Sequence, residues 1–520
     1  MILLYLEAGV SDAHHIHTKA SRSELAAAVE MVASRVKKLR VLLIPFFATS
    51  HIEPYTELAI RLAGARPDYA VEPTIAVTPA NVPIVQSLLE RRGQQGCIKI
   101  ATYPFPAVEG LPAGVENLGK VAAADAWRID AAAISDALMR PAQEALVRAQ
   151  SPDAMVADPH FSWQAGIAAD LGVPLVSFSV VGAFSGLVMG NLMAYGAVEE
   201  GEDAVTVPRF PLPEIRIPVT ELPEFLRTHL LERDGKDVDS IGKVSVGQNF
   251  GLAINTASHL EQQYCEMHTS GGQIKRAYFV GPLSLGAEAV APGGGGGETQ
   301  APPCIRWLDS KPDRSVVYLC FGSLTHVSDA QLDELALGLE ASGKAFLWVV
   351  RAAEQWRPPA GWAERVQDRG MLLTAWAPQT AILGHRAVGA FVTHCGWNSV
   401  LEAVAAGLPV LTWPMVFEQF ITERLVTEVM GIGERFWPEG AGRRSTRYEE
   451  HGLVPAEDVA RAVTTFMCPG GAGDAKRQRA MELAAESRAA MAEGGSSHRD
   501  LCRLVDDLVA AKLEREQVPS

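Results

Sequence analysis

Residues Trp376–Gln419 read WAPQTAILGHRAVGAFVTHCGWNSVLEAVAAGLPVLTWPMVFEQ. Two short apolar runs in this stretch, Ala390–Thr393 and Val410–Thr412, are typical of buried strands. Segments with helical spacing lie beside them, near residues 378–384 and 398–406. Because strands that alternate with helices form parallel sheets with right-handed crossovers, this stretch predicts an α/β fold.

The same alternation occupies most of the chain. In the first half, we expect strands at residues 41–46, 72–77, 154–158 and 175–178, and helices at residues 54–63, 83–92 and 163–171. In the second half, we expect further strands at residues 315–321, 345–350 and 372–375, and further helices at residues 328–339 and 418–430. Two doubly wound sheets place a cleft between their facing strand ends, where open α/β sheets bind ligands.

A Gly-rich segment separates the two halves. Five consecutive glycines at residues 293–297 cannot pack a core and favour a linker. An amphipathic pattern over residues 497–512 predicts a last helix. The expected division is a flexible N-terminal extension at residues 1–35, a Rossmann-like domain at 36–285, a linker at 286–303, a second Rossmann-like domain at 304–495, and a C-terminal helix at 496–520 that packs back toward the first domain.

The composition excludes several classes of protein. The 520 residues carry a formal net charge of −15, whereas a nucleic-acid partner would require a basic face. No apolar run reaches the roughly 20 residues that a membrane-spanning helix needs. The N-terminal MILLYLEAGV lacks the basic region and the cleavage site of a signal peptide, and seven scattered cysteines without a CxxC pair are typical of reduced thiols. We therefore expect a cytoplasmic protein.

The nonapeptide FVTHCGWNS at residues 391–399 is typical of an anion site. A strand ends near His394, Gly396 allows a tight turn, and a helix is expected to begin at Asn398. The N–H groups and the dipole of a helix start favour a phosphate. Capping alone would explain Asn398 or Ser399 taken singly, but together with His394 and Gly396 they favour a phosphate cradle. No GxxxxGK[ST] motif occurs, which excludes a P-loop kinase or ATPase.

Four further residues in the opening stretch complete a candidate nucleotide-sugar site. Glu402 lies one helical turn after Asn398, where an acid can accept hydrogen bonds from ribose hydroxyls; a solvated surface acid is the alternative. Trp376 can stack on a base, although a core tryptophan is the alternative. Glu418 and Gln419 offer the donors and acceptors that sugar hydroxyls need.

This combination resembles the signature box of the plant family 1 UDP-glycosyltransferases. The motifs W-A-P-Q, H-C-G-W-N-S, Glu402, G-x-P and E-Q all stand at the family's spacing, and the resemblance extends from about Arg40 to the C-terminal helix. It implies the GT-B fold, in which two Rossmann-like domains face each other across a cleft. It also implies a role for each matching residue: the uracil base at Trp376, Ala377 and Gln379, the diphosphate at Ser323, His394, Asn398 and Ser399, the ribose at Glu402, and the sugar at Trp397, Glu418 and Gln419.

The resemblance implies a catalytic pair in the first half of the chain. His51 follows the strand at residues 41–46 and matches the family's general base, and Asp158 matches the acid that orients it. Such an acid fixes the tautomer of the base and stabilises the imidazolium. From the residues alone, His51 could be a structural histidine and Asp158 the start of a turn; His160 and Asp170 are weaker candidates. The family commonly has glycine before the base, and this chain has Ser50.

The resemblance thus implies an inverting glucosyltransferase that uses UDP-glucose as co-substrate, without a metal or other cofactor. Trp397 and Gln419 are the residues that imply glucose. The acceptor would be the hydroxyl group of a small lipophilic plant metabolite, such as a flavonoid or another phenol, and the enzyme a monomer. Two alternatives stay open: C-glycosylation of an aromatic ring, and a non-catalytic UDP-sugar-binding protein. The acceptor pocket falls in the loops at residues 102–125, 180–200 and 205–245.

Overall fold

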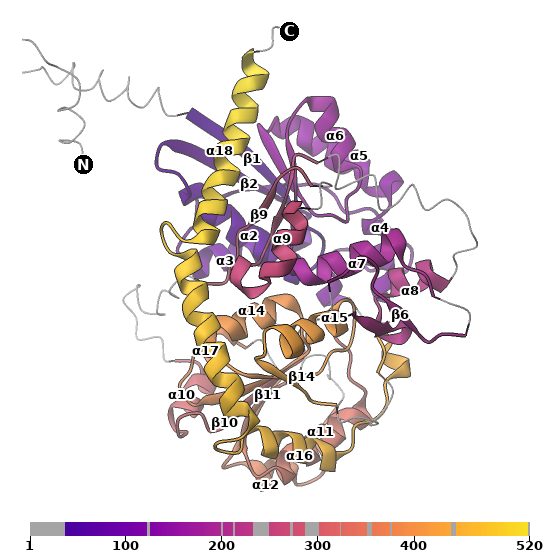
Figure 1. Ribbon diagram of the computed structural model, residues 1–520, viewed down its shortest axis with the longest axis vertical. Helices are drawn as coiled ribbons and strands as arrows, with labels where there is room; N and C mark the ends of the chain where they lie inside the picture. Colours follow the sequence, from indigo (N-terminus) through magenta and orange to yellow (C-terminus); the bar gives the residue numbers. More distant parts are fainter. Residues whose placement is uncertain are drawn as a thin grey trace, which may run out of the picture.

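The computed structural model describes residues 37–121, 125–198, 201–211, 214–231, 249–270, 274–285, 301–322, 324–350, 356–374, 377–437 and 444–517 (Figure 1). The predicted extension at residues 1–35 lies outside these residues, as do Ser323, Trp376 and residues 286–300 of the predicted linker. In the described part of the chain, the strands form two parallel sheets and one antiparallel hairpin.

The first sheet has seven strands in the order β3-β2-β1-β4-β5-β8-β9. Its strands are β1 Lys37–Ile44, β2 Tyr69–Val77, β3 Lys99–Thr102, β4 Ala154–Ala157, β5 Leu175–Ser179, β8 Gly251–Ile254 and β9 Ala277–Phe279. All neighbours pair in parallel, and Val41 in β1 is level with Pro73 and Ala154. We call this sheet and the helices packed on it the N-lobe.

The helices of this half, in chain order, are α2 Thr49–Gly64, α3 Val82–Arg91, α4 Ala126–Ala133, α5 Asp136–Gln150, α6 Gln164–Leu171, α7 Ala183–Tyr195, α8 Glu224–Leu231 and α9 Gln262–Ser270. Short 3-10 turns lie at Pro79–Asn81, Leu118–Lys120, Val219–Glu221 and Ser258–Leu260, and the hairpin joins β6 Ala204–Thr206 to β7 Arg216–Pro218. Every residue of β4 is buried, because the strand has a layer of helices on both faces.

The second sheet has six strands in the order β12-β11-β10-β13-β14-β15. They are β10 Val316–Cys320, β11 Ala345–Val349, β12 Gly370–Leu373, β13 Val388–Thr393, β14 Val410–Thr412 and β15 Gly433–Arg435, all parallel. The helices are α10 Pro303–Asp309, α11 Asp329–Ala341, α12 Trp362–Val366, α13 Gln379–Leu383, α14 Trp397–Ala406, α15 Gln419–Arg424, α16 Ala456–Phe466 and α17 Ala472–Met491, with a π-helix at Leu425–Val429 and a 3-10 turn at Tyr448–Glu450. We call this half the C-lobe.

The last helix, α18 Ser496–Gln517, packs on the N-lobe. Figure 1 shows α17 and α18 running along one side of the molecule, from the C-lobe to the N-lobe. Leu501, Leu504 and Leu508 are buried in the same apolar cluster as β1. Tyr278 in β9 donates a hydrogen bond to Asp507 at 2.6 Å, so the end of the chain closes over the edge of the first sheet.

No helix in the described residues is both long enough and apolar enough to cross a membrane.

Candidate active site

Both sheets have a point at which the strand order reverses. In the N-lobe this point lies between β1 and β4, and in the C-lobe it lies between β10 and β13. Loops leaving two such strands diverge and open a crevice at their carboxyl ends. His51 follows β1 and Asp158 follows β4, while Gly322 follows β10 and His394 follows β13. The topology therefore places these four residues at the two points where the strand order reverses.

His51 and Asp158 are directly hydrogen-bonded. Nδ1 of His51 lies 2.7 Å from Oδ2 of Asp158, whose side chain is fully buried. The carboxylate also accepts a hydrogen bond from the backbone N–H of Phe46. Because a carboxylate only accepts, Nδ1 of His51 carries the proton and Nε2 carries the free lone pair. This is the tautomer that a general base needs.

A second imidazole is hydrogen-bonded to the other oxygen of the same carboxylate. Nδ1 of His160 lies 2.6 Å from Oδ1 of Asp158. Burial alone would raise the pKa of the Asp158 carboxyl, but the two histidines outweigh burial and hold this pKa well below its usual range. His51, Asp158 and His160 thus form one cluster, in which each histidine is hydrogen-bonded to a different oxygen of Asp158.

In the C-lobe, two glycines make room for the ring of His394. A Cβ on Gly322 would lie 2.6 Å from Nε2 of His394, and a Cβ on Gly396 would lie 2.5 Å from the same atom. Gly322 also has a φ of +76°, in the left-handed region that favours glycine. The loops after β10 and β13 thus approach each other closely around one imidazole, as expected for a cradle that holds a phosphate.

A polar network joins α13 to α14. Nε2 of Gln379 donates to Oε2 of Glu402 at 2.6 Å and to Oγ of Ser399 at 3.1 Å, while Oε1 of Gln379 accepts from the Tyr318 hydroxyl. Burial raises the pKa of the Glu402 carboxyl to about 7, although the hydrogen bond from Gln379 works in the opposite direction. This carboxyl therefore changes charge near neutral pH.

Helix α14 begins one residue earlier than expected. It starts at Trp397 with the extended residue Gly396 as its N-cap, so Asn398 and Ser399 lie inside the first turn and do not cap it. The indole N–H of the buried Trp397 donates to the carbonyl of Asn255 at 2.8 Å, in the N-lobe. The start of α14 is therefore held against the opposite lobe.

Asn398 makes a second bond between the lobes. Its Nδ2 donates to the carbonyl of Ser50 at 2.7 Å, next to His51. This carbonyl is available because Pro54, four residues later in α2, has no N–H to donate to it. A proline inside the helix thus leaves an acceptor next to the candidate base, and the candidate phosphate site supplies the donor.

The remaining predicted residues lie near these crevices. Oε1 of the buried Gln419 accepts from the backbone N–H groups of Met415 and Val416, which leaves its Nε2 as the group that can reach a ligand. Burial raises the pKa of the Glu418 carboxyl, and its charge interacts with His51 and His160. Ala377 is buried, and its carbonyl accepts from the N–H of Gln379.

The chain is similar to several known proteins. Residues 300–437 match the family model described as UDP-glucoronosyl and UDP-glucosyl transferase. The chain is 34% identical to UDP-glucose flavonoid 3-O-glucosyltransferase 7 of Fragaria ananassa, over 92% of this chain and 98% of the relative. It is also 34% identical to the scopoletin glucosyltransferase of Nicotiana tabacum, over 91% of this chain and 98% of the relative.

The chain belongs to the plant family 1 UDP-glycosyltransferases. Among solved structures, it is similar to UGT73P12 of Glycyrrhiza uralensis, solved with glycyrrhetinic acid 3-O-monoglucuronide, with a TM-score of 0.77 and 30% identity over 92% of this chain and 97% of the other. The predicted GT-B fold is confirmed, and so is an enzyme that transfers a sugar from a UDP-sugar co-substrate.

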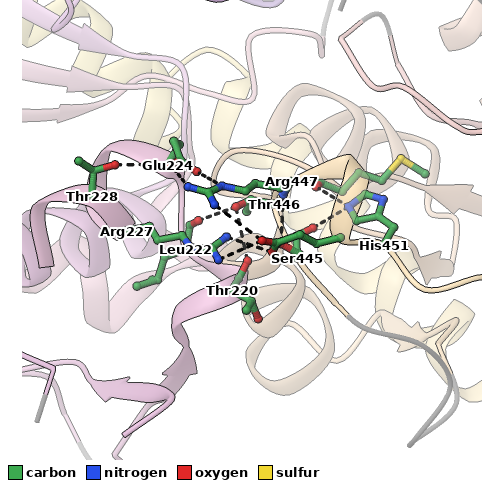
Figure 2. Close-up of polar contacts among 11 residues, drawn as sticks. Thr220, Leu222, Glu224, Arg227, Thr228, Ser445, Thr446, Arg447 and His451 are labelled. Carbon is green, nitrogen blue, oxygen red and sulfur yellow. Dashed lines mark hydrogen bonds and ion pairs between the residues drawn. The ribbon is translucent and has the colours of Figure 1, made fainter. Parts of the chain in front are cut away.

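This glycosyltransferase also has a polar clamp between its lobes, formed by residues 444–451 of the C-lobe and residues 219–227 of the N-lobe (Figure 2). The backbone N–H of Thr446 donates to the carbonyl of Thr220 at 2.8 Å, and its hydroxyl donates to the carbonyl of Leu222 at 2.7 Å. Arg447 pairs with Glu224, and Arg227 pairs with Glu450 at 3.2 Å. The clamp ties the two lobes together.

Four groups that contact the candidate residues are not among the predicted site residues. From the sequence, His160 ranks below Asp158, and neither the carbonyl of Asn255 nor that of Ser50 has any signal in a sequence. Tyr318 did carry a signal: it is a hydroxyl-bearing residue in the centre of a continuous apolar strand, where a buried hydroxyl needs a partner.

Proposed function

We propose that the enzyme is an inverting glucosyltransferase that transfers glucose from UDP-glucose to a hydroxyl group of a small phenolic acceptor. The observation that carries this proposal is the pair of His51 and the buried Asp158 at the N-lobe crevice. The bond from Asn398 to the carbonyl of Ser50 places this pair beside the start of α14. A protein that only binds a nucleotide sugar has no need of an oriented base at that point.

The transfer is a single displacement. Nε2 of His51 takes the proton of the acceptor hydroxyl, and Asp158 stabilises the imidazolium that forms. The acceptor oxygen bonds to the anomeric carbon while the bond from this carbon to the diphosphate breaks, and the electron pair leaves with UDP. Because attack occurs opposite the leaving group, an α-linked donor gives a β-glucoside. His51 then releases its proton to water.

Different residues of the proposed donor site bind different parts of the nucleotide sugar. We assign Trp376, Ala377 and Gln379 to the base, Glu402 to the ribose, and Trp397, Glu418 and Gln419 to the sugar. Ser323, His394, Asn398 and Ser399 are assigned to the diphosphate, whose developing charge they stabilise together with the start of α14. The contact of Gln379 with both Ser399 and Glu402 supports one continuous site.

A phenolic acceptor is supported by relatives. The Fragaria ananassa relative is named for a flavonoid and the Nicotiana tabacum relative for scopoletin. The test is an assay with isotope-labelled UDP-glucose and a panel of flavonoids, coumarins and triterpenoids, with the linkage read by NMR. We expect a β-linked, acid-labile O-glucoside and one UDP per transfer. An α-linked product, an acid-stable C-glucoside, or no transfer to any acceptor would contradict the proposal.

The close approach of Gly322 to His394 leads to a first prediction. Gly322→Ala would place a methyl group against the imidazole in a backbone conformation that costs alanine about 1–2 kcal/mol. A displaced His394 would lose a charge-assisted hydrogen bond worth about 1.5–3 kcal/mol, so we expect the KM for UDP-glucose to rise at least roughly tenfold. Steady-state kinetics measure this rise.

The matched control is Gly343→Ala. Gly343 has a similar φ of +66°, but a Cβ there meets nothing within 4 Å. This variant should lose stability and keep its KM for UDP-glucose. Equal KM values for the two variants would mean that backbone strain, and not the contact with His394, accounts for the effect.

Glu402 leads to a second prediction, on pH. A carboxylate accepts from two ribose hydroxyls, whereas its protonated form must also donate. Since the pKa of Glu402 is about 7, ionisation on going from pH 6 to pH 8 should strengthen UDP-glucose binding, up to about tenfold. Calorimetry in two buffers of different ionisation enthalpy should also detect proton release at pH 7. Glu402→Gln should bind UDP-glucose more weakly, and its affinity should no longer rise between pH 6 and pH 8. An unchanged rise in affinity over this pH range would contradict the assignment of Glu402 to the ribose.

A further inference from the structure

The hydrogen bonds of Asp158 raise the question of what His160 does. Asp158 already orients His51 through Oδ2, and His160 takes the other oxygen at 2.6 Å. The His160 ring stacks on Phe46 with centroids 4.3 Å apart, and its centroid lies 5.5 Å from that of His51. Two imidazoles therefore share one buried carboxylate as their nearest counter-charge, and a proton on one disfavours a proton on the other.

The position of each ring decides which one is protonated first. His51 lies in the first turn of α2, where the positive end of the helix dipole disfavours a cation. His160 lies in the turn between β4 and α6, outside the first turn of either neighbouring helix. Its side chain is 46% exposed, compared with 18% for His51, so water solvates a cation better at His160.

The other titratable groups around the two rings come from four places in the fold. Asp130 in α4 and Glu418 before α15 face both imidazoles, but burial raises the pKa of both carboxyls and weakens them as counter-charges. Tyr55 in α2 and Tyr103 after β3 lie near Asp158 and keep their protons, because burial raises their pKa. Although the His160 ring is partly exposed, its packing on Phe46 and its neighbours desolvates it and disfavours a charge, yet Asp158 raises the pKa of this histidine.

We propose that His160 is a positioning residue that takes the first proton bound by the cluster and so keeps His51 unprotonated. This inference rests on the proposed function, because it assumes that His51 is the base. A base beside a buried carboxylate tends to hold a proton in the resting enzyme and is then inactive. A cation bonded to the other oxygen of Asp158 disfavours a proton on His51. The enzyme therefore stays active at a lower pH than it would without His160.

The test is the pH dependence of kcat/KM in two substitutions at one position. His160→Phe keeps the stacking on Phe46 and removes the charge, so the acid limb should move up by about one pH unit, as expected for unit charges on rings 5.5 Å apart in partly hydrated surroundings. Activity at pH 6 then falls roughly tenfold relative to activity at pH 8. His160→Lys keeps a cation, and its acid limb should stay at or below that of the wild type. If His160 served only in packing, the acid limb would stay at the wild-type pH in both variants.

A second measurement does not depend on turnover. NMR of histidine labelled with nitrogen-15, assigned with His51→Ala and His160→Phe, gives the order in which the two imidazoles titrate. We expect His160 to bind its proton at higher pH than His51. An acid limb that does not move in His160→Phe, or protonation of His51 first, would overturn the inference. If the wild type transfers no sugar to any acceptor, the proposed function fails, and the NMR order alone decides this inference.

Discussion

His51→Ala is expected to abolish glucose transfer almost completely and to leave UDP-glucose binding intact. Positioned general bases contribute about 10²–10⁴-fold to the rate, so kcat should fall by a factor in this range. The proposed donor site lies in the C-lobe, and its contact with the first turn of α2 uses the carbonyl of Ser50, which the substitution retains. The dissociation constant of UDP-glucose should therefore change less than about threefold.

Calorimetry and single-turnover kinetics separate the two effects. The control is His385→Ala, which removes a histidine that also pairs with a carboxylate, Asp309, at 3.2 Å in the C-lobe. This variant should transfer glucose at nearly the wild-type rate. Full transfer by His51→Ala would eliminate His51 as the base, and loss of UDP-glucose binding together with kcat would show that the residue supports the fold.

Arg444→Met is expected to destabilise the enzyme more than a substitution of Arg447, in the same part of the clamp. Arg444 lies between two buried carboxylates: it pairs with Glu423 and donates to Glu221 at 2.7 Å. Removing one partner of a buried ion pair costs about 3–5 kcal/mol, because it leaves a charge without compensation. Here each carboxylate keeps a second partner, because Arg424 still pairs with Glu221 and Arg435 with Glu423. We therefore expect a smaller loss of stability, of about 2–3 kcal/mol.

The matched control is Arg447→Met, in the same segment. Arg447 pairs with Glu224, but both side chains are about half exposed, and exposed pairs contribute about 0–1 kcal/mol. Thermal unfolding should therefore show a fall in Tm of several degrees for Arg444→Met and little change for Arg447→Met. Equal losses in the two variants would mean that the buried position of Arg444 does not matter.

The strands could be predicted from the sequence because they are buried on both faces. Continuous apolar runs mark β4, β10 and β13 to within one or two residues. The start of α2 was missed by five residues, because Pro54 looked like the first turn of a helix. The helix begins at Thr49, and Pro54 lies inside it, where the carbonyl it leaves free bonds to a residue of the other lobe.

The site could be predicted only as far as its motifs extend. The spacing of the signature box singles out His394 and Glu402, but it cannot show that one carboxylate has two histidine partners. Bonds between residues more than a hundred positions apart, such as those from Trp397 to Asn255 and from Asn398 to Ser50, depend on how the lobes meet. The acceptor has no such signal, because the loops in which we expect its pocket carry no motif.

The clamp, of which Figure 2 shows the part around Arg447 and Glu224, has buried and exposed ion pairs that respond differently to dissolved salt. At an ionic strength of 0.1 M, charges in water are screened over about 10 Å, whereas buried pairs are screened much less. The exposed pair of Arg447 and Glu224 therefore weakens as salt is added, while the buried contacts of Glu221 persist. Added salt thus weakens the exposed ion pair between the lobes and leaves the buried ion pairs of the clamp nearly unchanged.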